Sequence, residues 1–223
     1  MHHKSKTQSF QDPDHTGPTN ISDVTDLEEI RAAAMQCRAC PLYLSATQTV
    51  FGEGKSDAEV MFVGEQPGDQ EDVAGRPFVG PAGKVLDQAL AEAGISRQKC
   101  YVTNAVKHFK WKPAGKRRIH EKPGAREIEA CRPWLDAEIR AISSKILVCL
   151  GATAVRSVFN QQLPVLKNRG RWMSSPFCPE TLVTVHPSSI LRGSDPELQR
   201  LAYQDLVADL LKVAQRLADS RPA

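Results

Sequence analysis

The sequence predicts an α/β fold, a three-layer α/β/α sandwich in which helices cover both faces of a central four-stranded parallel sheet. Four short apolar runs rich in β-branched residues predict the strands, because strands buried on both faces carry nearly continuous hydrophobic sequence. Segments with helical periodicity separate these runs, and alternation of strand and helix favours a parallel sheet. In 223 residues, 41% hydrophobic and 25% charged, this pattern fills one domain without internal repeats.

The predicted strands are short and mostly apolar, and they cover residues 59–64, 100–106, 145–150 and 181–185. The predicted helices cover residues 26–37, 81–93, 124–142, 152–159 and 196–217. The second of these helices shows the pattern most clearly. Leu86 and Leu90 share one of its faces, and Gly94 follows its end, where glycine often terminates a helix.

The two ends of the chain are predicted to lie outside the folded domain. Residues 1–25 are polar, so we expect a disordered tail there, then a single domain over residues 26–219 and a short C-terminal tail over residues 220–223. The N-terminal segment lacks the apolar core of a signal peptide, and no run of about 18 apolar residues could span a membrane. Six cysteines are too few for a disulfide scaffold. We therefore expect a cytoplasmic protein without a membrane association.

Basic residues are concentrated between Lys107 and Lys122. This segment holds seven Lys or Arg residues and one acid, a net charge of +6 within a total of +3, so the rest of the chain sums to −3. A local basic stretch on a mildly acidic body attracts a polyanion such as a nucleic acid. A solvated charged loop is the alternative interpretation.

Polar and glycine-rich segments follow each predicted strand. The carboxyl ends of parallel strands meet at one edge of the sheet, where α/β proteins bind their ligands. The segments that should meet at this edge are residues 64–69, Asn104, residues 151–153 and residues 186–189. Together they predict a binding or catalytic site.

Two carboxylates and one histidine at this edge are suited to catalysis. Glu65 and Asp69, within Gly-Glu-Gln-Pro-Gly-Asp, can act as a general base or stabilise a developing cation. His186 precedes a proline at the end of the last strand, where it can donate a hydrogen bond to developing negative charge. The alternatives are an ordinary Pro-Gly turn with solvated acids and a structural histidine.

Four further side chains can bind parts of a nucleotide. Phe78 lies in a Gly- and Pro-rich loop and can stack on a flat base, or it can anchor the loop in the core. The Asn104 amide can pair with a pyrimidine edge, or it can cap a turn. Ser188 and Ser189 can bind phosphate or cap a helix.

Cysteines with a metal-ligand spacing lie before the first strand. Cys37 and Cys40 form a Cys-x-x-Cys motif, in which both sulfurs can reach one iron or zinc ion. Cys131 is the best third ligand because it lies outside the strands, and His108 is a candidate for the fourth, with a surface or phosphate-contacting histidine as an equal alternative. Of the remaining cysteines, Cys149 and Cys100 are predicted to be buried thiols in strands. Cys178 lies in a loop, and its role is ambiguous.

Six short motifs follow one another through residues 26–217. They read Cys-x-x-Cys, Gly-Glu-x-Pro-Gly, Gly-Arg-Pro-Phe-Val-Gly-Pro-Ala-Gly, Tyr-Val-Thr-Asn, Leu-Gly-Ala-Thr-Ala and His-Pro-Ser. In this order the chain resembles the uracil-DNA glycosylase superfamily, in particular its iron–sulfur family 4. Gln66 replaces the usual Ala of that family, and residues 108–120 depart from its usual Cys-Arg-Pro-Pro sequence. These departures, with Lys-Arg-Arg-Ile-His at residues 116–120, resemble the UdgX branch.

The resemblance implies an enzyme that excises uracil from DNA and then becomes covalently attached through His120 to C1′ of the abasic sugar. His186 would donate to uracil O2, and His120 would attack in a neutral form that neighbouring cations favour. The residues implied in catalysis are His120, Glu65, His186, Asp69 and Gln66. Those implied in uracil binding are Phe78, Asn104, Gly64, Gln66 and His186. Those implied in DNA binding are Lys107, Lys116, Arg117, Arg118, Ser188 and Ser189.

The resemblance also implies a cofactor and partners. By position, Cys37, Cys40, Cys131 and His108 correspond to the four ligands of a [4Fe–4S] cluster, which would pin the N-terminal helix and the basic segment to the sheet. The implied partner is uracil-containing DNA, single strands included, with free uracil as product. A monomer in the bacterial cytosol or nucleoid is expected.

Two other functions remain open on the sequence. The first is a conventional family-4 glycosylase that turns over, in which His120 only contacts the DNA. The second is a non-catalytic iron–sulfur protein that binds nucleic acid. Substitution of His120 distinguishes the conventional glycosylase from a covalent enzyme. Substitution of His186 tests whether the protein is a non-catalytic binder.

Overall fold

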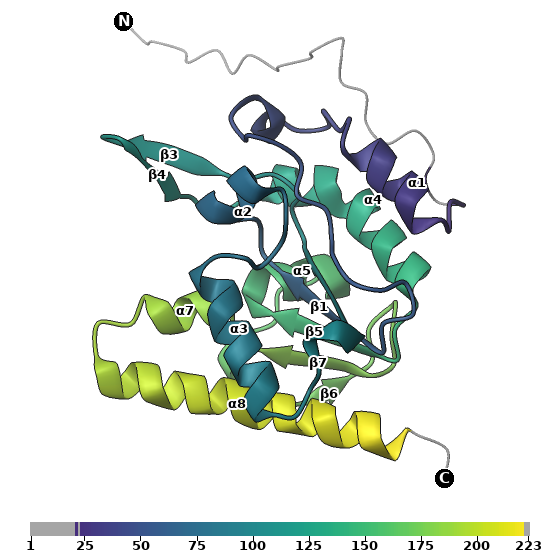
Figure 1. Ribbon diagram of the computed structural model, residues 1–223, viewed down its shortest axis with the longest axis vertical. Helices are drawn as coiled ribbons and strands as arrows, with labels where there is room; N and C mark the ends of the chain where they lie inside the picture. Colours follow the sequence, from purple (N-terminus) through teal and green to yellow (C-terminus); the bar gives the residue numbers. More distant parts are fainter. Residues whose placement is uncertain (1–20, 22, 221–223) are drawn as a thin grey trace, which may run out of the picture.

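The predicted fold class is confirmed. The computed structural model describes Ile21 and residues 23–220, and it has a mostly parallel central sheet flanked by helices (Figure 1). The strands follow the order β2-β1-β5-β7-β6 across the sheet. Four of them are parallel, as predicted, and their bounds are β2 (Cys100–Asn104), β1 (Val60–Gly64), β5 (Ile146–Leu150) and β7 (Thr181–Thr184). The fifth, β6 (Trp172–Met173), is a short antiparallel edge strand that the sequence did not predict.

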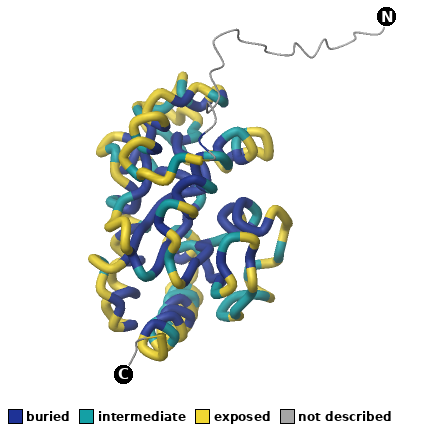
Figure 2. Tube along the Cα trace, turned by 90° about the vertical axis from the view of Figure 1, so that its right-hand side faces the viewer, coloured by how far each residue is buried: buried dark blue, intermediate teal, exposed yellow. Residues whose placement is uncertain are grey.

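The alternation of side chains along the strands produces two separate cores. Phe62 and Val148 point to one face, which is covered by α3 (Pro81–Glu92), α7 (Pro187–Leu191) and α8 (Pro196–Asp219). Val63 and Cys149 point to the other face, which is covered by α4 (Ala125–Ile142) and α5 (Gly151–Phe159). Every residue of the four parallel strands is buried, which explains their nearly continuous apolar sequence. Figure 2 shows these buried strands inside a shell of more exposed segments.

A third hydrophobic cluster attaches the N-terminal segment to the domain. The helix α1 (Leu27–Ala34) packs against α4, and the 3₁₀ turn η1 (Pro41–Leu44) follows it. Ile21 is buried in this cluster and Val24 packs against it, so packing extends N-terminal to the predicted domain boundary at residue 26. The remainder of the predicted N-terminal tail, residues 1–20 and 22, and residues 221–223 of the predicted C-terminal tail lie outside the described residues.

The basic segment, in which no strand was predicted from the sequence, is a β-hairpin. Strands β3 (Trp111–Ala114) and β4 (Arg117–His120) pair antiparallel and form a separate two-stranded sheet. The charged sequence concealed the strands because neither face of this hairpin is apolar. Three short helices were also missed, namely α2 (Asp69–Ala74), α6 (Val165–Asn168) and α7. No helix within the described residues is both long and apolar enough to cross a membrane.

Candidate active site

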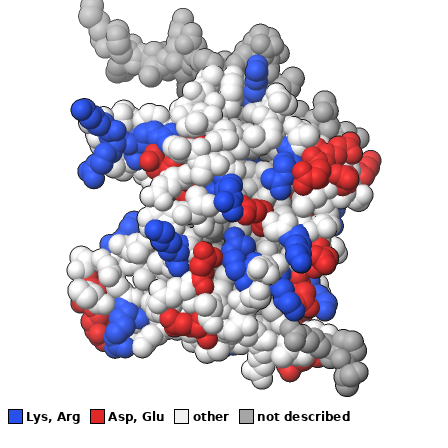
Figure 3. Space-filling view, in the orientation of Figure 1, with Lys and Arg blue, Asp and Glu red and all other residues white. Residues whose placement is uncertain are grey.

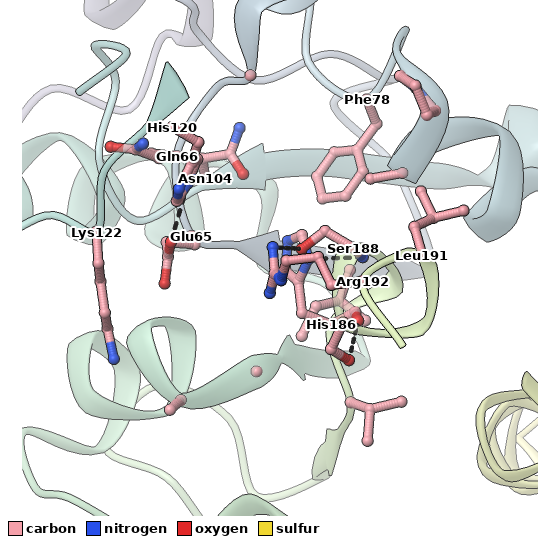
Figure 4. A pocket seen from close by; sticks show the side chains of 18 of the residues that line it. Glu65, Gln66, Phe78, Asn104, His120, Lys122, His186, Ser188, Leu191 and Arg192 are labelled. Carbon is pink, nitrogen blue, oxygen red and sulfur yellow. Dashed lines mark hydrogen bonds and ion pairs between the residues drawn. The ribbon is translucent and has the colours of Figure 1, made fainter. Parts of the chain in front are cut away.

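A cavity of about 850 Å³ lies at the carboxyl ends of the four parallel strands (Figure 4). Each strand contributes lining residues through the segment that follows it, as the sequence predicted for this edge. The contributions are Glu65 after β1, Asn104 at the end of β2, Gly151 after β5 and His186 after β7. The cavity is therefore built on the ends of the buried central strands.

One side of the cavity combines an aromatic ring with an amide. Gly64 makes this approach possible, because a Cβ atom at this position would collide with Asn104 Oδ1 and Phe78 Cζ. Phe78 adopts a left-handed backbone conformation with φ of 56°, which a non-glycine residue rarely does and which points to a functional constraint. No hydrogen bond engages the Asn104 side-chain amide among the described residues. A flat ring and a free amide edge stand next to each other in the cavity wall.

His186 is held as a neutral hydrogen-bond donor. Its Nδ1 atom accepts the backbone N–H of Ser188 at 3.1 Å and lies 2.8 Å from the Ser188 hydroxyl. Since a backbone N–H can only donate, the proton of the neutral ring is on Nε2, which is buried and has no partner among the described residues. Burial lowers the pKa of His186 to about 4, so the ring is neutral near pH 7. The His186 ring stacks near Phe78, with centroids 6.1 Å apart.

The two serines after His186 act first as structural partners. Ser188 bonds to His186 and accepts a hydrogen bond from Arg192 at 3.0 Å. The Ser189 hydroxyl donates to the His186 carbonyl at 2.7 Å. They lie in the first turn of α7, whose N-cap is His186, so the expected capping role is wrong, and both also line the cavity.

His120 faces Glu65 across a short contact. His120 Nε2 lies 3.2 Å from Glu65 Oε1 (Figure 4). The Thr153 hydroxyl donates to Glu65 Oε2. Burial raises the pKa of the Glu65 carboxyl, but the hydrogen bonds from His120 and Thr153 lower it more, so its pKa lies below the ordinary value. Glu65 is thus an ionised acceptor for a ring proton. Thr153 belongs to the predicted rim segment, but its part in holding Glu65 was not foreseen.

Gln66 fastens the hairpin that carries His120. Its side-chain amide donates to the carbonyls of Lys110 and Glu121, each at 3.1 Å, and accepts the backbone N–H of Lys110 at 3.2 Å. Lys110 directly precedes β3 and Glu121 directly follows β4, so one side chain closes the base of the hairpin. The side-chain amide of Gln66, which was expected to contact uracil, therefore binds the backbone of the hairpin instead.

Arg118 and Asp69 form a second attachment of the hairpin. The Arg118 guanidinium contacts Asp69 Oδ1 at 2.6 Å and the fully buried Asp72 Oδ2 at 2.5 Å. Asp69 thus pairs with Arg118, and it has no hydrogen bond with Glu65 among the described residues. Arg118 is largely covered, with 22% of its side chain exposed. Asp72 follows Asp69 by one helical turn of α2, a signal that was available in the sequence.

The predicted DNA-contacting lysines and arginines fall into two groups. Lys107 is 1% exposed and forms an ion pair with the buried Glu138, so the prediction that it contacts DNA is wrong. Lys116 and Arg117 are exposed at the turn of the hairpin, and Lys122 lines the cavity. Figure 3 shows basic side chains on the projecting hairpin, above a notch in the surface. The expected cations do not surround His120, because the charged side chain in contact with it is Glu65.

Three of the four predicted metal ligands share one buried cluster. Cys37, Cys40 and Cys131 are free thiols packed between α1, η1 and α4. The Trp134 indole N–H donates to Cys37 Sγ, and the Lys107 backbone N–H donates to Cys131 Sγ, both at 3.1 Å. Burial raises the pKa of the Cys131 thiol to about 12.

His108 follows the residue that contacts Cys131. Its Nε2 atom lies 3.0 Å from the Thr49 hydroxyl, and its Nδ1 atom is buried without a partner among the described residues. Over Ile21 and residues 23–220, no three His, Cys, Asp or Glu side chains converge closely enough to hold a metal ion. The donor set nevertheless fits an iron–sulfur group, because three thiols and one unpartnered imidazole nitrogen are gathered in the same region. The other cysteines, two in strands and one in a loop, are buried thiols, namely Cys149, Cys100 and Cys178.

The fold and the cavity agree with one family of proteins. Residues 51–207 match the uracil DNA glycosylase superfamily, and this match covers more than half of the chain. The chain therefore belongs to the uracil DNA glycosylase superfamily.

Within the superfamily, the chain is similar to enzymes named type-4 uracil-DNA glycosylase. It is 38% identical to the one from Thermotoga maritima, over 81% of this chain and 91% of the relative. It is 36% identical to the one from Sulfurisphaera tokodaii, over 80% of this chain and 81% of the relative. The enzyme from Archaeoglobus fulgidus is 40% identical over 60% of this chain and 64% of the relative.

Proposed function

We propose that this uracil-DNA glycosylase releases uracil from DNA and then remains covalently attached to the abasic sugar through His120, as in the UdgX branch. The observation that carries the proposal is the contact between His120 and Glu65, 3.2 Å long, inside the cavity that faces the substrate. Here the carboxylate can accept the ring proton that a nucleophile must lose.

The first step is the departure of uracil. A base buried in a duplex has to leave the stack before its glycosidic bond can be reached. The flipped base would stack on Phe78 and pair its edge with Asn104 next to Gly64. As the bond between N1 and C1′ breaks, its electron pair moves to uracil, and the Nε2–H of His186 stabilises the charge on O2. A neutral imidazole suits this role because it donates a hydrogen bond without surrendering a proton.

The second step joins protein and DNA. Loss of uracil leaves oxocarbenium character at C1′ of the sugar, and the lone pair of a His120 ring nitrogen forms the new C–N bond. The proton on the other ring nitrogen can pass to Glu65, which leaves a neutral substituted imidazole. The product has no activated leaving group, so we expect it to resist hydrolysis. Gln66 and Arg118 act as positioning residues, since they hold the hairpin from which His120 projects.

DNA would reach the cavity past the basic hairpin. Lys116 and Arg117 are exposed at its turn and can contact phosphates, while Lys122, Ser188 and Ser189 lie at the cavity itself. Single-stranded DNA avoids the energy of unpairing, so we expect it to be accepted. We expect the enzyme to act as a monomer and to release free uracil.

A [4Fe–4S] cluster is proposed for the buried cysteine region. Its ligands would be Cys37, Cys40, Cys131 and His108, the last through the Nδ1 atom that lacks a partner. When bound, the cluster supplies a structural link and no chemistry to uracil. The residues around it already connect α1 to α4 and to the segment that leads into the hairpin.

The experiment compares wild-type protein with His120→Ser on a labelled oligonucleotide that contains one uracil. After heating in SDS, we expect wild-type protein to form a slow protein–DNA band that a thymine oligonucleotide does not give. His120→Ser should lose this band but still release uracil, and Lys116→Ser, a change in the same hairpin, should retain the band. Alkali-labile strands without a heat-stable band in wild type would favour a conventional enzyme that turns over. Binding without release of uracil would favour a non-catalytic protein.

A further inference from the structure

A lysine is buried close to the end of β2, next to the cavity but not in its wall. Lys107 is 1% exposed and Glu138 of α4 is fully buried, and their side chains form an ion pair. Removal of two charges from water is costly, and apolar side chains of similar volume often stabilise a fold as well or better. The pair therefore calls for an explanation other than stability alone.

All three N–H groups of the Lys107 ammonium have an acceptor. One of them donates to Glu138 Oε2. The other two donate to Thr103 Oγ1 and to the backbone carbonyl of Asn104, each at 2.7 Å. Asn104 is the last residue of β2, and its side chain lines the cavity. The lysine thus holds the backbone of a residue in the cavity wall.

Glu138 is itself held from several sides. Its Oε1 atom accepts the Tyr101 hydroxyl at 2.8 Å and the Gly52 backbone N–H at 2.9 Å. Its Oε2 atom accepts the Thr103 hydroxyl at 2.9 Å. A Cβ atom at Gly52 would collide with Glu138 Oε1 and with the Tyr101 hydroxyl, so glycine allows the backbone to come this close. The carboxylate thus joins α4 to β2 and determines where the lysine ammonium lies.

The direction of the Asn104 amide depends on how its backbone is held. The amide has no hydrogen bond of its own among the described residues. The next two N–H groups of the chain donate to the carbonyls of the last residue of β1 and of the residue after it, each at 3.0 Å. These bonds hold the segment after β2 against β1, and the Lys107 side chain holds Asn104 itself.

We propose that Lys107 is a positioning residue for the recognition of uracil. It fixes the backbone carbonyl of Asn104 and so orients the amide that pairs with the edge of the flipped base. Hydrogen bonds weaken with angle as well as distance, so a small rotation of this backbone weakens the pairing. Glu138 acts through Lys107. The inference rests on the pairing of Asn104 with uracil proposed above, and it does not depend on the covalent step.

The test is a double-mutant cycle between Lys107 and Asn104, with single-turnover release of uracil as the readout. Lys107→Met is combined with Glu138→Gln, because this neutral pair leaves no unpaired charge in the core. The two changes together should slow release by about 10-fold to 100-fold. In protein that already carries Asn104→Ala, the same two changes should alter release by less than about twofold, because the side chain that they position is gone.

Two further measurements separate positioning from a loss of stability. Val213→Ala truncates a buried side chain of α8 that does not line the cavity, so it should lower the unfolding temperature without slowing release. The affinity of the Lys107→Met, Glu138→Gln variant for an oligonucleotide without uracil should equal that of wild type, because binding through phosphates does not involve Asn104.

The outcomes separate this inference from the proposed function. Effects of the two changes that multiply with the effect of Asn104→Ala would show that Lys107 acts elsewhere, and would overturn the inference. An unchanged rate in the Lys107→Met, Glu138→Gln variant would overturn it too, as would an equal loss of release in Val213→Ala. If Asn104→Ala released uracil as fast as wild type, the proposed role of Asn104 would fail and this inference with it, while the release of uracil by wild type would still stand.

Discussion

The two histidines of the cavity are held in different ways. His186 stands at the end of a core strand and is fixed by Ser188, two residues further along the chain. His120 stands on a hairpin outside the central sheet and is fixed by contacts with Glu65 and, through the hairpin base, with Gln66. His186, assigned to the release of uracil, thus belongs to the core. His120, assigned to the attachment, belongs to a hairpin that is held against the core. The two steps should therefore respond to different substitutions.

The largest effect is expected at the core histidine. His186→Ala removes the donor for uracil O2, and one such preorganised donor contributes roughly 10²–10³ in rate. Release of uracil should fall by that factor, and attachment should fall with it because no sugar cation forms. Single-turnover release and adduct formation are both measured, with Lys55→Ala, an exposed residue that does not line the cavity, as the control. Unchanged release in His186→Ala would show that the core histidine does not take part.

Glu65 should affect attachment more than release. Glu65→Gln keeps the shape of the side chain but cannot accept the ring proton of His120, so adduct formation should fall about 10²-fold, the usual size of a proton-transfer effect. Release of uracil should change less. Glu121→Gln, an exposed acid next to His120, is the control. Equal losses of release and attachment would contradict the separation of the two steps.

Loosening the hairpin that carries His120 should also slow adduct formation, but by less than the loss of the Glu65 carboxylate. Gln66→Ala removes three hydrogen bonds at the base of the hairpin, so His120 would be positioned less well. We expect adduct formation about tenfold slower, with release nearly unchanged. Hydrogen exchange of the β3–β4 amides, measured on the same variant, should become faster. A defect confined to release would instead indicate direct contact between Gln66 and uracil.

The exposed turn of the hairpin should influence only the affinity for DNA. Lys116→Ala and Arg117→Ala each remove one exposed cation, and each should reduce the slope of log K against log salt by about 1. The fraction of bound DNA that becomes attached should not change. A binding titration over several salt concentrations measures the slope. A substitution that left the slope unchanged would place that side chain away from phosphate.

The pH dependence tests the environment of His186. Burial lowers its pKa to about 4, so the ring stays neutral as the pH falls through the ordinary histidine range. In His120→Ser, which isolates the first step, uracil release should be constant from about pH 8 to about pH 5 and should change only near the lowered pKa. A transition near pH 6.5, the unperturbed value, would mean that His186 is exposed to solvent during the reaction.

The same comparison explains what the sequence could predict. The strands and the residues that follow them were predictable, since apolar runs identify buried parallel strands and the topology brings their ends together. Glu65, Asn104 and His186 were found in this way. Phe78 was identified in the loop that follows the first strand.

The hairpin was not predictable by the same means. Its strands are short and charged, and what fixes them is long-range, namely the amide of Gln66 and the carboxylates of Asp69 and Asp72. The burial of Lys107 was also hidden, because its partner Glu138 lies far along the chain on α4. A basic residue in a basic stretch gives no local sign that it is paired in the core.

The most direct test of the account is to map the attachment point by mass spectrometry. Protein that has reacted with a short uracil oligonucleotide is digested with nuclease and trypsin. Cleavage after Arg118 and Arg126 gives a peptide over residues 119–126 with a single histidine, His120. We predict that fragment ions place the deoxyribose adduct on this histidine without any reducing agent. An adduct on Lys122, or one that requires borohydride to survive, would contradict attachment through His120.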